Sequence, residues 1–342
     1  MNNIYMLAVI SIVISAILTP LVKKLAVKLK VIDIPKDSRR VHNKPIPLLG
    51  GLGIYISFLI TLILNKGPLT SSEKGLILGS TIIVIGGVID DKYDIKPWCK
   101  LLFQISATLV LIYFGIKITI ITNPLNPIYE FINIGMLSIP FTIIWVVGIT
   151  NAMNLIDGLD GLAAGIALIS SITIFIIALL NGRNEAAMLI LIFSGAIIGF
   201  LPYNFNPATI FMGDTGSQLL GFMLSAISIE GAIKAAAAFS IAVPILALGI
   251  PIYDMLFAVI RRKINGKPIM QADRGHLHHR LLDMGLNQKQ AVITMYIISA
   301  ILGSLSIIAM EVNPQKSYFV LAAVMVVLVI IAWKAGFFKH KE

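Results

Sequence analysis

The sequence predicts an all-α integral membrane protein, a polytopic bundle of about eleven transmembrane helices. Of its 342 residues, 57% are hydrophobic and only 13% are charged, whereas soluble domains carry roughly 25% charged residues. The apolar residues gather in runs near the length of about 20 residues that a membrane-crossing helix needs. The few charges lie between these runs, so we expect a single membrane-embedded domain over residues 1–342.

The apolar runs give the expected spans in order. The first begins without basic residues and has no clear cleavage site, which indicates a retained helix rather than a signal peptide. The runs 76–89, 137–150 and 217–229 are short, so they need polar ends that reach toward water. The full set is 4–22, 48–64, 76–89, 99–116, 137–150, 162–180, 187–201, 217–229, 233–259, 291–310 and 317–333.

Basic residues test this map independently, because they accumulate on cytoplasmic loops. With the N-terminus outside and the C-terminus in the cytoplasm, 21 of the 27 Lys and Arg residues and all five His residues fall on the cytoplasmic side. All the aspartates lie on or beside that side as well. We therefore expect a multi-pass protein of the cytoplasmic (inner) membrane, with an active-site face formed by loops 23–47, 90–100, 151–161, 202–216 and 260–290.

The composition also excludes several classes of protein. The single cysteine, Cys99, allows no internal disulfide and no paired-cysteine metal or redox motif. The net charge of +10 is explained by membrane orientation and phosphate binding, so no nucleic-acid partner is needed. A transporter of an anionic solute would carry ionisable residues near mid-span and two related halves. The sequence has neither.

Adjacent carboxylates, Asp90 and Asp91, close the apolar run 76–89. Neighbouring residues on a helix point about 100° apart, so one carboxylate suits a metal and the other a substrate. An ordinary helix end, with the acids paired to Lys92 and Lys96, is the alternative.

The segment from Asn154 to Leu162 places oxygen ligands at a spacing of three. In a helix, Asn154, Asp157 and Asp160 would share one face. Oxygen ligands without nearby Cys or His suit Mg²⁺, which commonly bridges to phosphates. A glycine-rich loop with exposed acids is the alternative.

A further acid, Asp214, lies in a glycine-framed turn before an apolar run, where helix capping is the alternative function. Just upstream, Asn204 and the neighbouring aromatic residues offer hydrogen bonds and stacking surfaces for a nucleobase.

Three histidines lie between Arg274 and Arg280 in the largest cytoplasmic loop: His276, His278 and His279. Arginine grips phosphate through two hydrogen bonds, and histidine can donate to it, so phosphate binding is favoured. Zinc binding and a solvated loop are the alternatives. Acids for Mg²⁺, a basic loop for phosphates and apolar walls together predict phosphoryl transfer between a soluble phosphorylated compound and a lipid phosphate at the cytoplasmic face.

The chain resembles the polyprenyl-phosphate N-acetylhexosamine-1-phosphate transferases in five ordered motifs. These are Pro45 to Gly51, Asp90-Asp91, Asn154 to Leu162, Phe211 to Ser217 and His276 to Arg280. The resemblance implies transfer of a sugar 1-phosphate from a UDP-sugar to undecaprenyl or another polyprenyl phosphate, with release of UMP. It also implies a Mg²⁺ requirement, with Mn²⁺ as a substitute, and a place at the first membrane step of teichoic acid, lipopolysaccharide or other envelope polysaccharide synthesis.

The resemblance further implies roles for individual residues. Asn154 and Asp214 would bind the metal with Asp91 close by, and Asp90 would activate the lipid phosphate. Asp157, Asp160, Asn204 and Phe211 would surround the uridine and sugar. The expected phosphate contacts, several of them catalytic, are Lys44, Lys100, Arg274, His276, His278, His279 and Arg280.

Two features favour the N-acetylglucosamine branch of this family. Asp94 stands where the muramoyl-pentapeptide branch commonly has a lysine, and the His-Leu-His-His-Arg form of the last motif is similar to the N-acetylglucosamine branch. A phospho-N-acetylmuramoyl-pentapeptide transferase is the alternative. The oligomeric state, including a homodimer, is left open.

Overall fold

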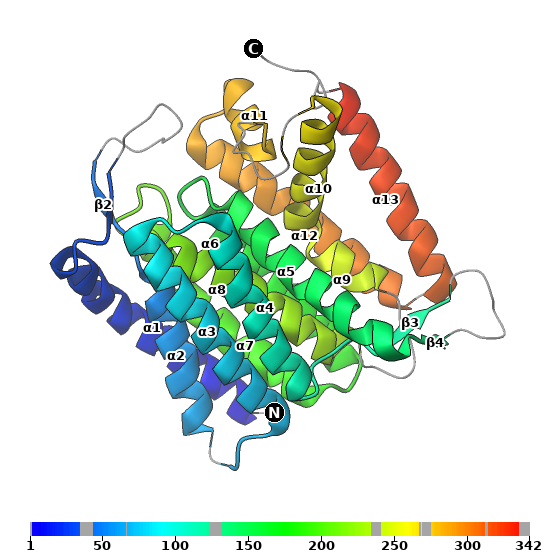
Figure 1. Cartoon of the computed structure of the whole chain (residues 1–342), viewed down its shortest axis with the longest axis horizontal. Coiled ribbons are helices and arrows are strands. Elements are labelled where there is room, and N and C mark those ends of the chain that lie inside the picture. Colours follow the sequence, from blue (N-terminus) through cyan, green and yellow to red (C-terminus); the bar gives the residue numbers. More distant parts are fainter. Residues whose placement is uncertain are drawn as a thin grey trace.

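The computed structural model describes residues 2–34, 44–65, 67–123, 131–233, 241–266, 268, 275–311 and 314–334. They form a helical bundle with two short hairpins (Figure 1). The helices are α1 (Asn2–Lys28), α2 (Gly50–Leu64), α3 (Ser71–Tyr93), α4 (Pro97–Tyr113), α5 (Ser138–Ile156), α6 (Leu162–Leu180), α7 (Asn184–Asn204), α8 (Gly213–Ser228), α9 (Ala242–Ala247), α10 (Gly249–Ile264), α11 (Leu277–Asp283), α12 (Gln288–Glu311) and α13 (Pro314–Lys334). The strands are β1 (Ile32–Asp33), β2 (Ile46–Pro47), β3 (Ile120–Thr122) and β4 (Phe131–Asn133).

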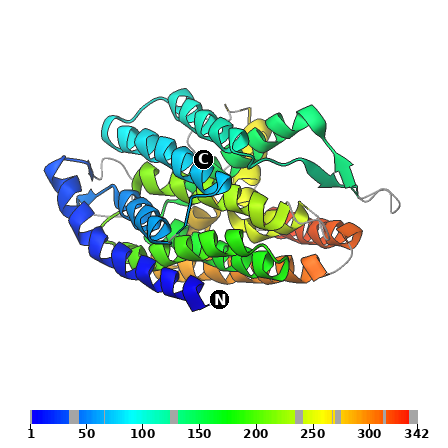
Figure 2. The same cartoon turned by 90° about the horizontal axis from the view of Figure 1, so that it is seen from below.

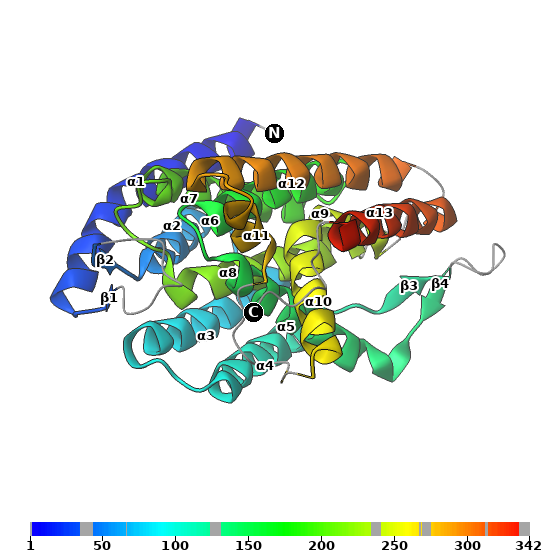
Figure 3. The same ribbon diagram turned by 90° about the horizontal axis from the view of Figure 1, so that it is seen from above.

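Helix α8 lies at the centre of the bundle. Every residue from Thr215 to Ser228 is buried, and α2, α3, α5, α6 and α7 pack around it (Figure 3). A central helix needs no lipid-facing surface, so the short predicted span 217–229 fits this position. Only at the N-terminal turn of α8 can polar groups of this helix form part of an accessible site.

The outer helix α1 presents its apolar residues outward. Four apolar residues spaced four apart are each at least 50% exposed: Val9, Val13, Ile17 and Leu21. Its small polar residues point inward instead, where Ser11 Oγ donates to the carbonyl of Ile192 (2.8 Å) and Ser15 Oγ donates to that of Ala196 (2.6 Å). This pattern is the reverse of a soluble helix and is typical of a helix that faces lipid.

Within the described ranges, six helices are long and apolar enough to cross a membrane, namely α1, α3, α5, α6, α7 and α12. Among the described residues, α2, α4 and the segment Tyr318–Ile330 of α13 are shorter apolar helices. The chain is thus a multi-pass, largely α-helical membrane protein, as predicted. The count of eleven spans and the outside position of the N-terminus stay predictions.

The helices extend further than the predicted loops allowed. In the predicted loop 23–47, α1 continues to Lys28, and the predicted loop 90–100 shrinks to a short connection between α3 and α4. The loops 151–161, 202–216 and 260–290 are shortened in the same way at their ends, and the last contains α11. The helix ends differ from the ends of the apolar runs because polar residues end an apolar run without ending the backbone hydrogen bonding of its helix. The cytoplasmic loops themselves stay predictions.

The apolar run 233–259, predicted as one span, contains a break between α9 and α10. Pro251 has no N–H, so it cannot donate to the carbonyl of Ala247 one turn earlier. Ser170 Oγ from α6 donates to that carbonyl instead, at 2.9 Å. The break is therefore satisfied by a neighbouring helix, and the single-helix prediction was wrong here.

Two antiparallel hairpins, which the all-α prediction omitted, flank the bundle. Strand β1 pairs with β2 so that Asp33 lies opposite Ile46, and β3 and β4 project beyond the helices (Figure 2). Phe211 N–H donates to the carbonyl of Pro47 at 2.9 Å, which ties the first hairpin to the connection between α7 and α8. We call the end of the bundle where α3, α5 and α7 end and α4, α6 and α8 begin the motif end, because all five sequence motifs meet there.

Candidate active site

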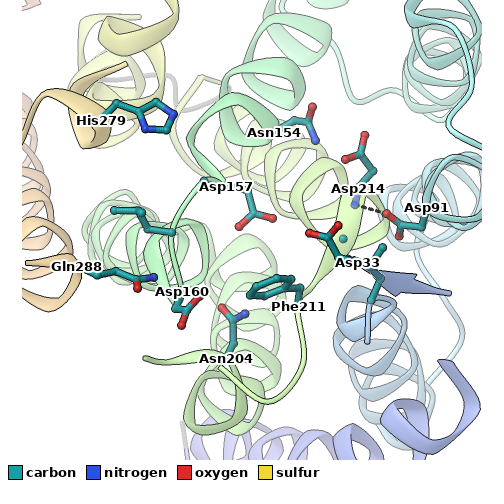
Figure 4. Close-up of a pocket in the computed structure, with 14 residues that line it drawn as sticks. Asp33, Asp91, Asn154, Asp157, Asp160, Asn204, Phe211, Asp214, His279 and Gln288 are labelled. Atoms are coloured by element: carbon teal, nitrogen blue, oxygen red, sulfur yellow. Dashed lines mark hydrogen bonds between the residues drawn. The ribbon is translucent and has the colours of Figure 1, made fainter. Parts of the chain in front are cut away.

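A cavity of about 360 Å³ opens at the motif end (Figure 4). It lies over the N-terminus of α8 and between the last turns of α3, α5 and α7. Its lining residues are Asp33, Leu48, Asp91, Asn154, Asp157, Gly158, Leu159, Asp160, Asn204, Phe211, Gly213, Asp214, His279 and Gln288.

Asp91 joins α3 to the N-terminus of α8. Its Oδ1 accepts from the N–H of Asp214 (2.7 Å), and its Oδ2 accepts from the N–H (3.1 Å) and hydroxyl (2.6 Å) of Thr215. A carboxylate in this position satisfies N–H groups that have no partner within their own helix. The approach is possible because Gly87 has no side chain, and a Cβ there would lie 2.7 Å from the backbone nitrogen of Thr215.

Lys100 bridges two carboxylates. Its Nζ lies 2.5 Å from Asp90 Oδ2 and 2.7 Å from Asp214 Oδ2. Asp90 is buried and also accepts from the N–H of Ile95 at 3.0 Å. Neither Asp90 nor Lys100 lines the cavity, so both act on it through Asp214.

The connection after α5 carries Asp157 into the cavity. Asn154 Nδ2 donates to Ser217 Oγ at 2.8 Å, which fixes the end of α5 against α8. Burial raises the pKa of Asp157 from 3.8 to about 8, and the charges of Asp214, Asp91 and Asp160 add to that rise. Asp157 therefore holds a proton at neutral pH unless a cation enters the cavity.

Asp157→Asn should change how the stability of the metal-free protein depends on pH. Between pH 3.8 and about 8, the folded protein keeps a proton at Asp157 that the unfolded chain has lost, so wild-type stability falls as pH rises through this window. We expect the variant to gain Tm over wild type progressively in the window and to hold a constant gain above it. Thermal unfolding in EDTA at a series of pH values measures this, and a gain independent of pH would contradict it.

Polar groups on the other side of the cavity order the loop after α7. Asp160 Oδ2 accepts from Asn206 Nδ2 (3.0 Å) and from the N–H of Ala208 (2.9 Å), and Asn206 Nδ2 also donates to Gln288 Oε1 (2.7 Å). Asn204 Nδ2 donates to the carbonyl of Ile210 at 3.1 Å. The buried Oδ1 of Asn204 has no partner among the described residues.

The three histidines of the last motif have different environments. His276 Nδ1 lies 2.8 Å from Asp254 Oδ2, and the N–H of Leu277 donates to Asp254 Oδ1 at 2.8 Å. His278 is 1% exposed and packs against Gly158, and neither of its ring nitrogens has a hydrogen-bond partner among the described residues. Burial, and then the neighbouring His279, lowers its pKa from 6.5 to about 3, so it is neutral at physiological pH. His279 lines the cavity.

The structure brings most of the predicted site residues to one cavity. Eight line it: Asp91, Asn154, Asp157, Asp160, Asn204, Phe211, Asp214 and His279. Lys44, Arg280, His276 and His278 lie outside the described lining, and Arg274 lies outside the described residues. His278 is too enclosed to meet a phosphate directly, so its predicted phosphate contact is not supported by the geometry.

Asp33 and Gln288 line the cavity but were not among the predicted site residues. Asp33 belongs to no motif and reaches the cavity through the β1–β2 pairing. Gln288 begins α12. Its polar side chain at the start of an apolar helix was the one feature of the sequence that could have indicated a place in the site.

The lining is strongly acidic. It contains five carboxyl groups, Asp33, Asp91, Asp157, Asp160 and Asp214, and His279 is its only basic side chain among the described residues. Such a cavity repels a phosphate unless cations enter with it. The arrangement can therefore bind a hard cation together with an anionic substrate.

Comparisons with known proteins identify relatives of the chain. Residues 74–232 match the family described as Glycosyl transferase family 4. The chain is 38% identical, over 100% of its length and 94% of the relative, to a Bacillus subtilis protein named "Probable undecaprenyl-phosphate N-acetylglucosaminyl 1-phosphate transferase". It is 32% identical to the decaprenyl-phosphate N-acetylglucosaminephosphotransferase of Mycolicibacterium smegmatis, over 91% of this chain and 83% of that one. It is 30% identical to the undecaprenyl-phosphate alpha-N-acetylglucosaminyl 1-phosphate transferase of Thermotoga maritima, over 93% and 94%.

Proposed function

The chain belongs to the polyprenyl-phosphate N-acetylhexosamine-1-phosphate transferase family, and from that premise we propose that it transfers N-acetylglucosamine 1-phosphate from UDP-N-acetylglucosamine to undecaprenyl phosphate and releases UMP. The acceptor and the transferred group follow from the names of its relatives. The proposal rests on the acidic cavity at the motif end. Apolar membrane helices end there, and polar residues of their last turns line the cavity. A lipid phosphate and a soluble nucleotide can both reach such a position.

Mg²⁺ is the cofactor that fits these residues. Five carboxyl groups face one cavity, so a diphosphate enters only with its charge offset. Asn154 donates from its amide nitrogen to Ser217, so its amide oxygen can bind a cation. Asp214 supplies an anionic oxygen. Both oxygens of Asp91 already accept from α8, so we assign Asp91 to holding Asp214 in place, with any metal contact as an addition. When bound, Mg²⁺ would offset the diphosphate charge and polarise the phosphorus–oxygen bond that breaks.

The chemical step that we favour is direct displacement. An oxygen of the lipid phosphate attacks the sugar-linked phosphorus, and the bond from that phosphorus to the bridging oxygen breaks. UMP leaves with the bridging oxygen and its electron pair. A largely ionised phosphate monoester is already a nucleophile at neutral pH, so no strong base is required. Asp90, which the resemblance assigns to lipid activation, is engaged by Lys100 and the Ile95 N–H, and we assign it to holding Lys100.

The far side of the cavity suits the nucleoside and sugar. Phe211 offers an aromatic face. The Oδ1 of Asn204, which has no partner in the described part of the chain, can accept from an N–H of a uracil ring or an acetamido group. Asp160 keeps the loop over this region in place through Asn206 and Ala208. The excess of basic residues at the motif end supports a cytoplasmic position for the site.

A transfer assay tests the proposal. Purified protein in detergent, given undecaprenyl phosphate, Mg²⁺ and UDP-N-acetylglucosamine, should release UMP and form lipid-linked product in a one-to-one ratio. EDTA should stop the reaction, and Mg²⁺ or Mn²⁺ should restore it. UDP-N-acetylmuramoyl-pentapeptide and UDP-N-acetylgalactosamine, tested in parallel, should give little product. A preference for either would overturn the donor assignment, and product in EDTA would overturn the cofactor. A phosphorylated enzyme intermediate would overturn direct displacement.

A further inference from the structure

Three carboxamide side chains meet in the interior of the bundle beneath the cavity. They come from three helices: Gln104 from α4, Asn151 from α5 and Gln218 from α8. Gln104 is 1% exposed and Gln218 is 3% exposed. None of the three lines the cavity. Burying an amide among apolar helices costs free energy unless the amide is hydrogen-bonded, so three buried amides in one place indicate a specific role.

The three amides form a chain of hydrogen bonds that ends at Asp214. Asn151 Nδ2 donates to Gln104 Oε1 (2.7 Å), and Gln104 Nε2 donates to Gln218 Oε1 (3.0 Å). Gln218 Nε2 then donates to Asp214 Oδ2 (3.3 Å). We call Asn151, Gln104 and Gln218 the amide chain. The bonds from Gln104 to Gln218 and from Gln218 to Asp214 both point toward the carboxylate, and hydrogen bonds aligned in one direction strengthen one another. Gln104 and Asn151 bond to each other in both directions, because Gln104 Nε2 also donates to Asn151 Oδ1 at 3.4 Å.

The negative charge of Asp214 dictates this direction. A carboxylate oxygen accepts and repels another carbonyl oxygen, so Gln218 must turn its N–H toward Asp214 and its carbonyl toward Gln104. Gln104 must then present an N–H to Gln218. The last donor of the chain and Lys100 Nζ meet at the same atom, Asp214 Oδ2. Gln218 from α8 and Lys100 from α4, together with the side chain of Asn154 from α5, thus hold this carboxylate in one orientation.

We propose that the amide chain is a set of positioning residues that fixes Asp214 for cation binding. The inference rests on the proposed function, because it takes Asp214 as a group that binds the Mg²⁺ used in transfer. Packing alone would be served as well by apolar side chains of the same size, as replacement of all partners of a buried hydrogen-bond network is often neutral for stability. Apolar side chains could not orient Asp214, because they donate no hydrogen bond to it.

Two kinds of variant separate positioning from packing. Gln218→Met removes the donor to Asp214, and Gln104→Met removes the donor to Gln218. The triple variant Asn151→Leu, Gln104→Met, Gln218→Met replaces every member, so no amide is left without a partner and the fold should keep its Tm. We expect about 3- to 10-fold weaker Mn²⁺ binding and a matching rise in the Mg²⁺ concentration for half-maximal transfer in all three, as expected for loss of a hydrogen bond to a charged group.

Thr108→Val is the matched control. Its hydroxyl is buried on α4 one turn from Gln104 and donates only to the Gln104 backbone carbonyl, at 2.7 Å. Mn²⁺ binding, measured by the paramagnetic resonance signal of the free ion without substrates, should be unchanged in this variant. Wild-type Mn²⁺ affinity in Gln218→Met and the triple variant would overturn the proposal. Absence of transfer by the wild type would instead overturn the proposed function, while the Mn²⁺ comparison would still decide the role of the amide chain.

Discussion

Asp214→Asn should lower kcat by at least about 100-fold, a loss typical of removing one fixed charge from a transition-state site. The variant keeps the shape of the side chain but removes the negative charge that Lys100 contacts and that a cation would bind. The fold should survive, because Asp91 accepts from the backbone N–H of Asp214 and not from its side chain. Single-turnover transfer assays and thermal unfolding of the same preparation measure the two effects separately.

Asp94→Asn is the control for this substitution. Asp94 lies at the same end of the bundle, is exposed, and caps α3 in the left-handed region at φ 50°, which asparagine adopts readily. We expect kcat within about twofold of wild type, as for surface changes away from a site. Equal kcat in Asp214→Asn and wild type, with the same Mg²⁺ response, would remove Asp214 from the site.

The sequence was sufficient to predict that four motif residues would meet. Asp91, Asn154, Asp157 and Asp214 lie where apolar runs end or begin, and alternating spans bring such positions to the same side. Asp33 was not predictable in this way. It reaches the cavity only because a two-residue strand pairs with another more than ten positions away, and such long-range pairing leaves no local pattern.

The histidine motif shows a second limit of sequence reasoning. The sequence predicted phosphate contacts for all three histidines. Consecutive residues of a helix, however, point in directions about 100° apart. His278 and His279 are consecutive in α11, so His278 is enclosed and His279 faces the cavity, whereas His276 precedes the helix in an extended conformation and pairs with Asp254. Which direction each takes depends on how α11 packs against the connection after α5. That packing is a tertiary property.

Gly158→Ala should reduce activity by about 10- to 100-fold, because the turn that carries Asp157 would have to move. A Cβ at Gly158 would lie 3.0 Å from Cε1 and 3.2 Å from Cδ2 of His278, and closer still to Nε2. The ring cannot retreat freely, since its centroid is 4.2 Å from that of His279 and 5.8 Å from that of the parallel His276 ring. Gly148→Ala in α5 is the control, because a Cβ at this position would meet nothing within 4 Å.

Adding His278→Ala to Gly158→Ala should restore much of the lost activity, because the smaller side chain leaves room for the new methyl group. His278→Ala alone should cost less than Gly158→Ala, since both ring nitrogens lack partners in the described structure and only packing is lost. A double-mutant cycle on kcat/KM measures the coupling. If His278 instead contacted a phosphate, removing it would add to the defect of Gly158→Ala. Additive losses would therefore assign His278 to the substrate, and recovery would assign it to positioning the Asp157 turn.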